Sequence, residues 1–229
     1  DEIVVFLKCL NIEHPVKRAE EKLEECYKKR NSEGVHQKYK NILIVMDEGI
    51  GNMVMLTPAI KALKMQMPGS KITILGTQPS VQVLDGWDII EKVLTEPDDE
   101  QYDIGFLSVW SRKFIHRYGV SLKAQCDTIY KIELDNIDMH EAEHHLKIAR
   151  FFGYEGDIPE PFCMAKDVNI TVSTGKKIVA LSNTTLDNAV WEKKRWPYYH
   201  VLARELINRN YTVLLIGGKD EAERFSKVD

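Results

Sequence analysis

The sequence lacks the features that would point to a membrane-spanning or secreted protein. Its 229 residues contain no apolar run close to the roughly 20 residues that a membrane-spanning helix needs, and no secretory-type segment begins it. Its four cysteines, Cys9, Cys26, Cys126 and Cys163, are far apart and form no Cys-x-x-Cys pair, which argues against a disulfide framework or a zinc site. We therefore expect a reduced compartment, with the cytoplasm as the predicted location.

The sequence also has no large excess of charge of one sign. Its formal net charge of −4 gives no reason to expect nucleic acid as a partner. With 44% hydrophobic and 29% charged residues, the composition is that of an ordinary globular protein. A chain of 229 residues is long enough for one large domain or two small ones.

Residues 1–40 are expected to form an N-terminal extension outside the main fold. Residues 14–30 are dense in lysine, arginine and glutamate around a thin apolar stripe, which predicts a surface helix. Residues 31–40 are polar and contain Gly34, as in a linker. Peripheral association of this helix with a membrane or a partner is the alternative, although its mixed charges argue against a basic membrane-binding face.

The stretch from residue 41 to 67 organises the rest of the chain. Residues 42–46 are an unbroken apolar run, which predicts a strand buried on both faces in a parallel sheet. In the turn that follows, Gly49 and Gly51 let the backbone bend sharply and approach a ligand closely. An apolar helix comes next, and its free N–H groups suit an anion or a sugar hydroxyl. Doubly wound α/β proteins bind ligands at this corner, although tight turns also use glycine for purely structural reasons.

Strands and helices alternate after this unit, which predicts a parallel α/β sheet. Within the first helix, Thr57 and Pro58 predict a kink or a restart, with Thr57 as a cap. Further strands are expected over residues 71–76, 89–94, 102–110 and 127–134, with a short helical segment at residues 81–84.

A second helix is expected over residues 138–152. Asp138 and Glu141 fit a capping box at its start, and Gly153 follows its end. Its core face is predicted to consist of Ala142, Leu146, Ala149 and Phe152.

Residues 140–144 match His-Glu-x-x-His, the pattern in which two histidines of a helix bind zinc and the glutamate activates a water molecule. The helical periodicity places His140 and His144 at the solvent edge of the helix, and no third ligand is marked downstream. His145 lies nearer the apolar side and is predicted to be a packing residue. A zinc hydrolase is therefore the least favoured hypothesis.

The chain is predicted to contain a Rossmann-like domain over residues 41–165 and the start of a second one over residues 166–229. One β-α-β unit of about 50 residues is too small for an ordinary independent core, so we expect this second domain to be incomplete. Its expected elements are a strand at residues 177–181, a helix from Pro197 to Arg209 with Val201, Leu202 and Leu206 buried, a left-handed cap at Asn210, and a strand at residues 211–216.

Two polar segments of the second domain are candidates for ligand binding. Lys193, Lys194 and Arg195 lie between two tryptophans and just before a predicted helix, a combination that suits a diphosphate. Most such triplets are solvated basic turns, but tryptophans in a loop need a reason to be there. The polar run 182–185 follows the strand that precedes them, on the side where open α/β sheets bind ligands, although such runs also serve as caps and turns.

In this order, these pieces resemble glycosyltransferase family 9, the heptosyltransferase-like enzymes. Residues 41–67 are similar to the family's opening strand, glycine turn and helix with Thr-Pro-Ala, and residues 177–221 to its strand, polar loop, Lys-Arg-Trp-Pro, helix, strand and Gly-Gly. The helix ending in Phe-Phe-Gly-Tyr at residues 151–154 also looks like the family's. The resemblance covers most of residues 41–221.

The resemblance implies a GT-B architecture, with an acceptor sugar on the N-terminal domain and a nucleotide-diphosphate sugar on the C-terminal one. It implies inverting transfer of a heptose-like or other hexose unit to a cell-surface glycan or lipid-linked sugar, without a metal or a further cofactor, at the inner face of the membrane or in the cytoplasm. By position, Lys194 would contact the donor diphosphate with Arg195 beside it. Ser182, Asn183 and Thr184 would line the nucleotide-sugar side.

The chain departs from the family's pattern at two places. The family usually has aspartate, its general base, where this chain has Asn52, and an amide cannot accept a proton at neutral pH. Asp47 or Glu48, in the same turn, is the expected substitute. In addition, the family's later donor-binding segment has no counterpart before Asp229, as expected of a partial chain. A non-catalytic glycan- or nucleotide-binding protein with the same fold is therefore the alternative to a transferase.

Overall fold

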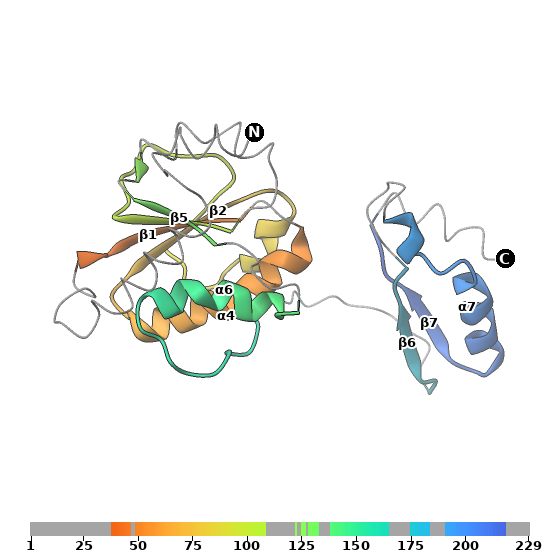
Figure 1. Ribbon diagram of the computed structural model, residues 1–229. Coiled ribbons are helices and arrows are strands. Elements are labelled where there is room, and N and C mark those ends of the chain that lie inside the picture. The colour runs from red at the N-terminus through yellow and green to blue at the C-terminus, as the bar shows by residue number, and fades with distance from the viewer. Residues whose placement is uncertain are drawn as a thin grey trace. The chain divides into compact units, whose positions relative to one another are not determined.

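The computed structural model describes residues 38–46, 49–108, 122, 125–126, 128–132, 138–164, 175–183 and 191–218. The chain divides into two compact units, residues 1–165 and residues 166–229 (Figure 1). The expected N-terminal surface helix lies outside the described residues. In the part of the chain that is described, no helix is long and apolar enough to cross a bilayer.

The first unit is built on a five-stranded parallel sheet with the order β3-β2-β1-β4-β5. The sheet order reverses at β1, which pairs with β2 on one side and with β4 on the other. In open α/β sheets, the carboxyl ends of the strands at such a reversal are where ligands bind. The predicted α/β class is confirmed, and the strands are β1 (Asn41–Met46), β2 (Lys71–Gly76), β3 (Lys92–Leu94), β4 (Ile104–Leu107) and β5 (Ile129–Lys131).

Helix α4 (Ile50–Gln66) follows β1 and continues through Pro58, so the predicted restart at Thr57 is wrong. Proline has no N–H group for the Val54 carbonyl one turn earlier. The Thr57 hydroxyl instead donates to that carbonyl oxygen at 2.7 Å and replaces the missing hydrogen bond. The same hydroxyl oxygen accepts the backbone N–H of Phe162 at 2.8 Å and thereby ties the segment after residue 153 to α4.

Helix α6 (Glu141–Phe151) begins later than predicted, because its N-cap is His140 rather than Asp138. The predicted capping box is therefore wrong, since the His140 side chain accepts the N–H of Ala142. The helix ends at Phe151, with Phe152 as its C-cap, and Gly153 follows this end as predicted. Gly153 takes a φ of 96°, which favours glycine, and the N–H of Tyr154 bonds back to the Ala149 carbonyl to close the last turn.

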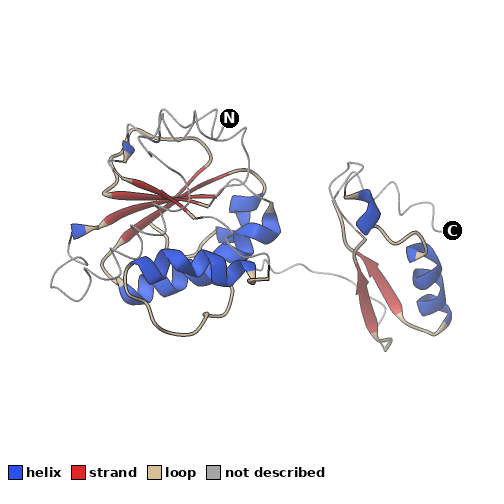
Figure 2. Ribbon diagram, in the orientation of Figure 1, coloured by secondary structure: helices blue, strands red, loops and turns tan. Residues whose placement is uncertain are grey.

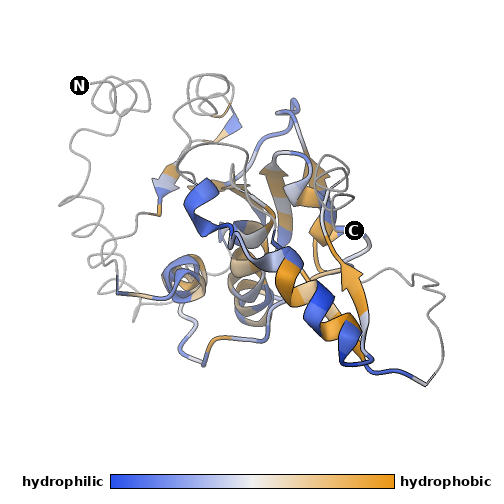
Figure 3. Cartoon of the chain, turned by 90° about the vertical axis from the view of Figure 1, so that its right-hand side faces the viewer, coloured by the Kyte–Doolittle hydropathy of each residue, from blue (hydrophilic) through white to orange (hydrophobic). Residues whose placement is uncertain are grey.

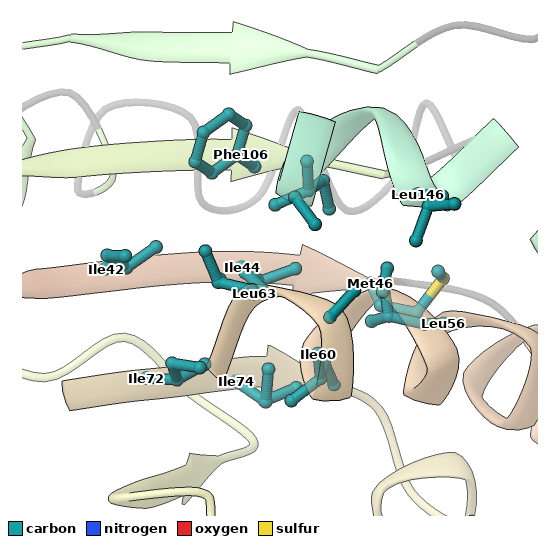
Figure 4. Close-up of a cluster of buried hydrophobic side chains, with 14 of the residues drawn as sticks. Ile42, Ile44, Met46, Leu56, Ile60, Leu63, Ile72, Ile74, Phe106 and Leu146 are labelled. Atoms are coloured by element: carbon teal, nitrogen blue, oxygen red, sulfur yellow. The ribbon is translucent and has the colours of Figure 1, made fainter. Parts of the chain in front are cut away.

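The main core lies between the sheet and the helices α4 and α6, which pack side by side on one face of it (Figure 2). Apolar side chains of both helices and of the three central strands meet there, as Figure 4 shows for Leu63, Leu146 and Phe106. A short 3-10 helix, η1 (Ser80–Leu84), closes the end of this core. A smaller cluster on the other face consists of Leu43, Val45, Leu75, Tyr102, Leu107, Leu122 and Cys126.

The second unit contains β6 (Ile178–Leu181), a 3-10 turn η2 (Glu192–Lys194), helix α7 (Tyr199–Asn208) and β7 (Thr212–Leu215), which pairs with β6 in parallel. The helix starts after Pro197 rather than at it. Figure 3 shows apolar and polar residues along α7 beside the apolar strand β7. Val201, predicted to be buried, is 50% exposed, and the buried residue of α7 is Ala203. The left-handed cap at Asn210 is confirmed by its φ of 66°.

Candidate functional site

The turn between β1 and α4 places Gly49, Gly51 and Asn52 at the carboxyl edge of the sheet. Gly49 is the N-cap of α4 with φ −66° and ψ 174°, and Gly51 lies in the first helical turn. Any residue can adopt the conformation of Gly49, so its backbone does not require glycine. A Cβ atom at Gly51 would meet nothing within 4 Å. Asp47 and Glu48, the predicted substitutes for a catalytic base, lie outside the described residues.

Ser108 reaches the same edge of the sheet from the neighbouring strand. It directly follows β4, and its backbone N–H donates to the Val45 carbonyl of β1 at 2.8 Å. Its side chain is 1% exposed, so the hydroxyl faces the interior. Ser108 therefore marks the point at which the sheet order reverses.

A chain of hydrogen bonds joins this edge to helix α6. The Asn52 amide donates through Nδ2 to Oε1 of Glu141 at 2.7 Å. Nε2 of His145, which is fully buried, lies 3.3 Å from the same carboxylate oxygen, and its Nδ1 lies 2.7 Å from the Ser108 hydroxyl. Because the carboxylate can only accept, Nε2 of His145 donates to it, and in the neutral ring Nδ1 accepts from Ser108. Four side chains from α4, α6 and the end of β4 thus form one connected polar network.

Glu141 is an ionised carboxylate within this network. The hydrogen bond from His145 lowers the pKa of Glu141, burial opposes this shift, and the bond from Asn52 lowers it further. The Glu141 side chain is still 29% exposed. Its side-chain contacts with the described residues all reach the Oε1 oxygen and leave Oε2 without a partner there. A carboxylate oxygen without a partner can accept a proton or a hydrogen bond from a ligand that reaches it.

From the sequence, Glu141 was predicted only as part of a helix capping box and as the glutamate of a zinc site. Its four-residue spacing from His145 on one helix was the available signal for a contact. The bond between Glu141 and Asn52 joins residues that are 89 positions apart, and the bond between His145 and Ser108 joins residues that are 37 positions apart. No local sequence pattern indicates contacts over such separations.

The structure argues against the zinc hypothesis. His140 lies outside the helix with φ −63° and ψ 138°, so it does not share a helical face with His144 as a zinc-binding pair would. His144 is 2% exposed, and its predicted place at the solvent edge is wrong. Within the described ranges, no group of three or more histidine, cysteine, aspartate or glutamate residues could hold a metal ion.

In the second unit, Asn183 holds the basic loop in place. Its Nδ2 donates to the Trp196 carbonyl and its Oδ1 accepts the Trp196 N–H, both at 3.0 Å. The neighbouring Ser182 carbonyl accepts the Tyr199 hydroxyl. Both ends of the Asn183 amide are thus used to fix the entry to α7, whereas Thr184 lies outside the described residues.

Lys194 is the last residue of η2, and Arg195 is its C-cap, shortly before α7. The Lys194 ammonium lies 4.0 Å from the ring centroid of the Trp191 side chain, a cation–π contact that explains why a tryptophan occupies this loop. Helix α7 has no side-chain cap at its N-terminus. The loop therefore places Lys194, held against Trp191, and Arg195 just before a helix N-terminus in the sequence, and phosphate groups prefer such surroundings.

This architecture, a five-stranded parallel sheet plus a small second parallel sheet, matches that of GT-B heptosyltransferase structures. The chain matches the glycosyl transferase family 9 structure from Veillonella parvula with a TM-score of 0.64 and 15% identity, over 86% of this chain and 68% of that one. It matches the ADP-heptose lipopolysaccharide heptosyltransferase II of E. coli with a TM-score of 0.62 and 16% identity, over 82% and 67%. For the E. coli heptosyltransferase WaaC with ADP-2-deoxy-2-fluoro heptose, the values are 0.56 and 16%, over 82% and 72%.

At these identities the likeness extends to the fold. No protein-family model matches the chain, and no curated protein matches it in sequence. The resemblance that the sequence motifs indicated is thus confirmed as a structural match over most of the chain.

Proposed function

We propose that the protein is a glycosyltransferase that moves a heptose-like or other hexose unit from a nucleotide-diphosphate sugar to a hydroxyl of a cell-surface glycan or lipid-linked sugar. The transfer would invert the anomeric centre and use no metal. The observation that carries the proposal is the ionised carboxylate of Glu141, bonded to Asn52 at the carboxyl edge of a sheet whose fold is that of heptosyltransferases.

The first unit would bind the acceptor. Asn52 and Glu141 offer hydrogen-bonding groups that orient a sugar hydroxyl, and the open space beside Gly51 permits close approach of a sugar to the first turn of α4. The second unit would bind the donor, with the Lys194 ammonium and the Arg195 guanidinium near its diphosphate. The matching WaaC structure contains an ADP-sugar analogue, ADP-2-deoxy-2-fluoro heptose, which supports a nucleotide sugar as the ligand class.

A non-catalytic glycan- or nucleotide-binding protein is the second candidate. It is favoured by Asn52, because an amide stands where the resembled family usually has its base. The two candidates share ligand binding and differ in turnover, so binding and transfer must be measured separately.

Calorimetric titration of the full chain with ADP, UDP and GDP tests the donor site. We expect one of them to bind, and Lys194→Ala to weaken this binding about tenfold, the equivalent of about 1.4 kcal/mol. Lys176→Ala, an exposed lysine of the same unit, is the matched control and should leave the affinity unchanged. Absence of binding by all three nucleotides would overturn the proposal.

Release of nucleoside diphosphate is then measured with ADP-heptose, UDP-glucose and GDP-mannose in the presence of methyl glycosides. Release that depends on the glycoside supports a transferase. Binding of nucleotide and glycoside with no transfer product would favour the non-catalytic candidate.

A further inference from the structure

The described residues place one carboxylate in hydrogen-bond contact with the first turn of α4, that of Glu141. It comes from α6, 89 residues further along the chain, and it reaches the edge of the sheet where β1 and β4 end. The sequence motifs marked Glu141 only as part of a capping box and as the glutamate of a possible zinc site, and did not connect it with Asn52.

The orientation of Asn52 explains why the carboxylate is there. Its Nδ2 is directed to Glu141, whereas its Oδ1 lies on the side of Gly49, 3.8 Å from the position of a Cβ atom on that glycine. The amide therefore presents a donor to the carboxylate and an acceptor to the turn. A sugar hydroxyl that donates a hydrogen bond near Asn52 would lie within reach of Glu141, because their side chains touch at 2.7 Å.

The second contact of Glu141 fixes which of its oxygens is available. His145 and Asn52 both bond to Oε1, and the buried bond from Ser108 to His145 prevents the imidazole ring from turning away. Among the described residues Oε2 thus has no hydrogen-bond partner, and the Glu141 side chain as a whole is 29% exposed. His145, Ser108 and Asn52 act as positioning residues in this arrangement.

We propose that Glu141 is the general base of the transfer, with Asn52 as the group that orients it. This inference rests on the proposed function. The acceptor oxygen forms a bond to the anomeric carbon, and the bond from that carbon to the donor phosphate oxygen breaks. The nucleoside diphosphate leaves with the electron pair, the hydroxyl proton passes to Oε2 of Glu141, and solvent later removes it.

The first test is Glu141→Gln in the full chain. Glutamine keeps an oxygen that accepts from Asn52 and His145 but cannot take a proton at neutral pH. We expect acceptor-dependent release of nucleoside diphosphate to fall about 10²–10⁴-fold, the usual effect of losing a general base. The affinity for the nucleotide should not change. Glu143→Gln, an exposed carboxylate of the same helix, is the matched control and should keep the wild-type rate.

The second test separates a base from a purely structural carboxylate. The double variant Asn52→Asp with Glu141→Gln exchanges the carboxylate and the amide, so that the new amide on α6 can donate to the new carboxylate on α4 and the pair keeps its hydrogen bond. If a base is needed at this position, the double variant should transfer sugar at least about tenfold faster than Glu141→Gln. This variant also serves if Glu141→Gln alone does not fold.

The outcomes distinguish this inference from the proposed function. A wild-type chain that transfers sugar, combined with a Glu141→Gln variant as active as Glu143→Gln, would overturn the role of Glu141 alone. A double variant as inactive as Glu141→Gln would also overturn it. A wild-type chain that binds no nucleotide and transfers no sugar would overturn both proposals.

Discussion

The two units of the chain use the same strand, helix and strand pattern with very different burial. In the first unit, β1 is fully buried from Ile42 to Met46, and the middle of α4 is buried as well. In the second unit, the apolar side chains buried among the described residues are Leu181 of β6 and Ala203 of α7. Several large apolar side chains of that unit are about half exposed: Ile178, Trp196, Val201, Ile207 and Ile216.

The difference shows that a β-α-β unit acquires a core only from further layers. In the first unit, β4 covers the open edge of β1, and α6 packs beside α4, so that each apolar residue meets neighbours from several elements. The described residues of the second unit offer two strands and one main helix. The apolar faces of such a unit exceed what one helix can cover.

The largest expected effect follows from separating the units. Residues 38–165 alone should unfold cooperatively, because the core of this unit is formed within it. Residues 166–229 alone should show no cooperative transition, because little apolar area is buried there. Thermal unfolding followed by circular dichroism of the two fragments is the measurement.

A sharp, reversible transition of the fragment 166–229 would contradict this comparison. The fragment 38–165 with Leu63→Ala serves as control, since a real transition must move when its core is damaged.

A pair of matched side-chain truncations sharpens the comparison. Leu63→Ala on α4 removes a fully buried side chain and should cost about 2–5 kcal/mol of unfolding free energy. Ile207→Ala on α7 removes a side chain that is 55% exposed and should change stability by less than about 0.5 kcal/mol. Urea titration of the full chain checks both, and an equal loss for the two variants would be the contrary result.

Sequence alone predicted the elements that depend on local signals. The apolar run at residues 42–46 is a buried central strand, and Gly153 and Asn210 end helices in the left-handed region. These positions carry their information in residue type and spacing. The fold class follows from the alternation of such elements.

Errors arose where a distant contact decides the local structure. Pro58 stays inside α4 because Thr57 supplies the missing hydrogen bond and is itself held by Phe162. Val201 is exposed because the described elements beside α7 do not cover it. The contact of Asn52 with Glu141 joins positions 89 residues apart, so a single sequence could mark Asn52 but could not pair it.

The polar network of the first unit predicts a pH-dependent effect that is smaller than the core truncation. The pKa of Glu141 is lowered in the folded state by His145 and Asn52, so its ionised form stabilises the fold. This stabilisation is complete above the ordinary pKa of 4.5 and is lost as the pH falls below it, through the folded-state pKa. Glu141→Gln should therefore be less stable than wild type at pH 7, with a difference that shrinks in acid. Urea titrations at pH 7 and below pH 4.5 measure it, and a difference independent of pH would contradict the assignment.

The smallest effect is expected from Asn183, whose contacts are local. Asn183→Ala removes two hydrogen bonds to the Trp196 backbone in an exposed loop and should cost about 1 kcal/mol or less of unfolding free energy. Its main consequence should be faster amide exchange at Trp196, whose N–H loses its acceptor, and weaker nucleotide binding by the loop that carries Lys194.

Thr212→Ala, a half-buried side chain of the same unit away from the loop, is the control. If exchange at Trp196 is unchanged while nucleotide affinity falls, Asn183 contacts the ligand directly, as the sequence resemblance implies, and does not act by holding the loop.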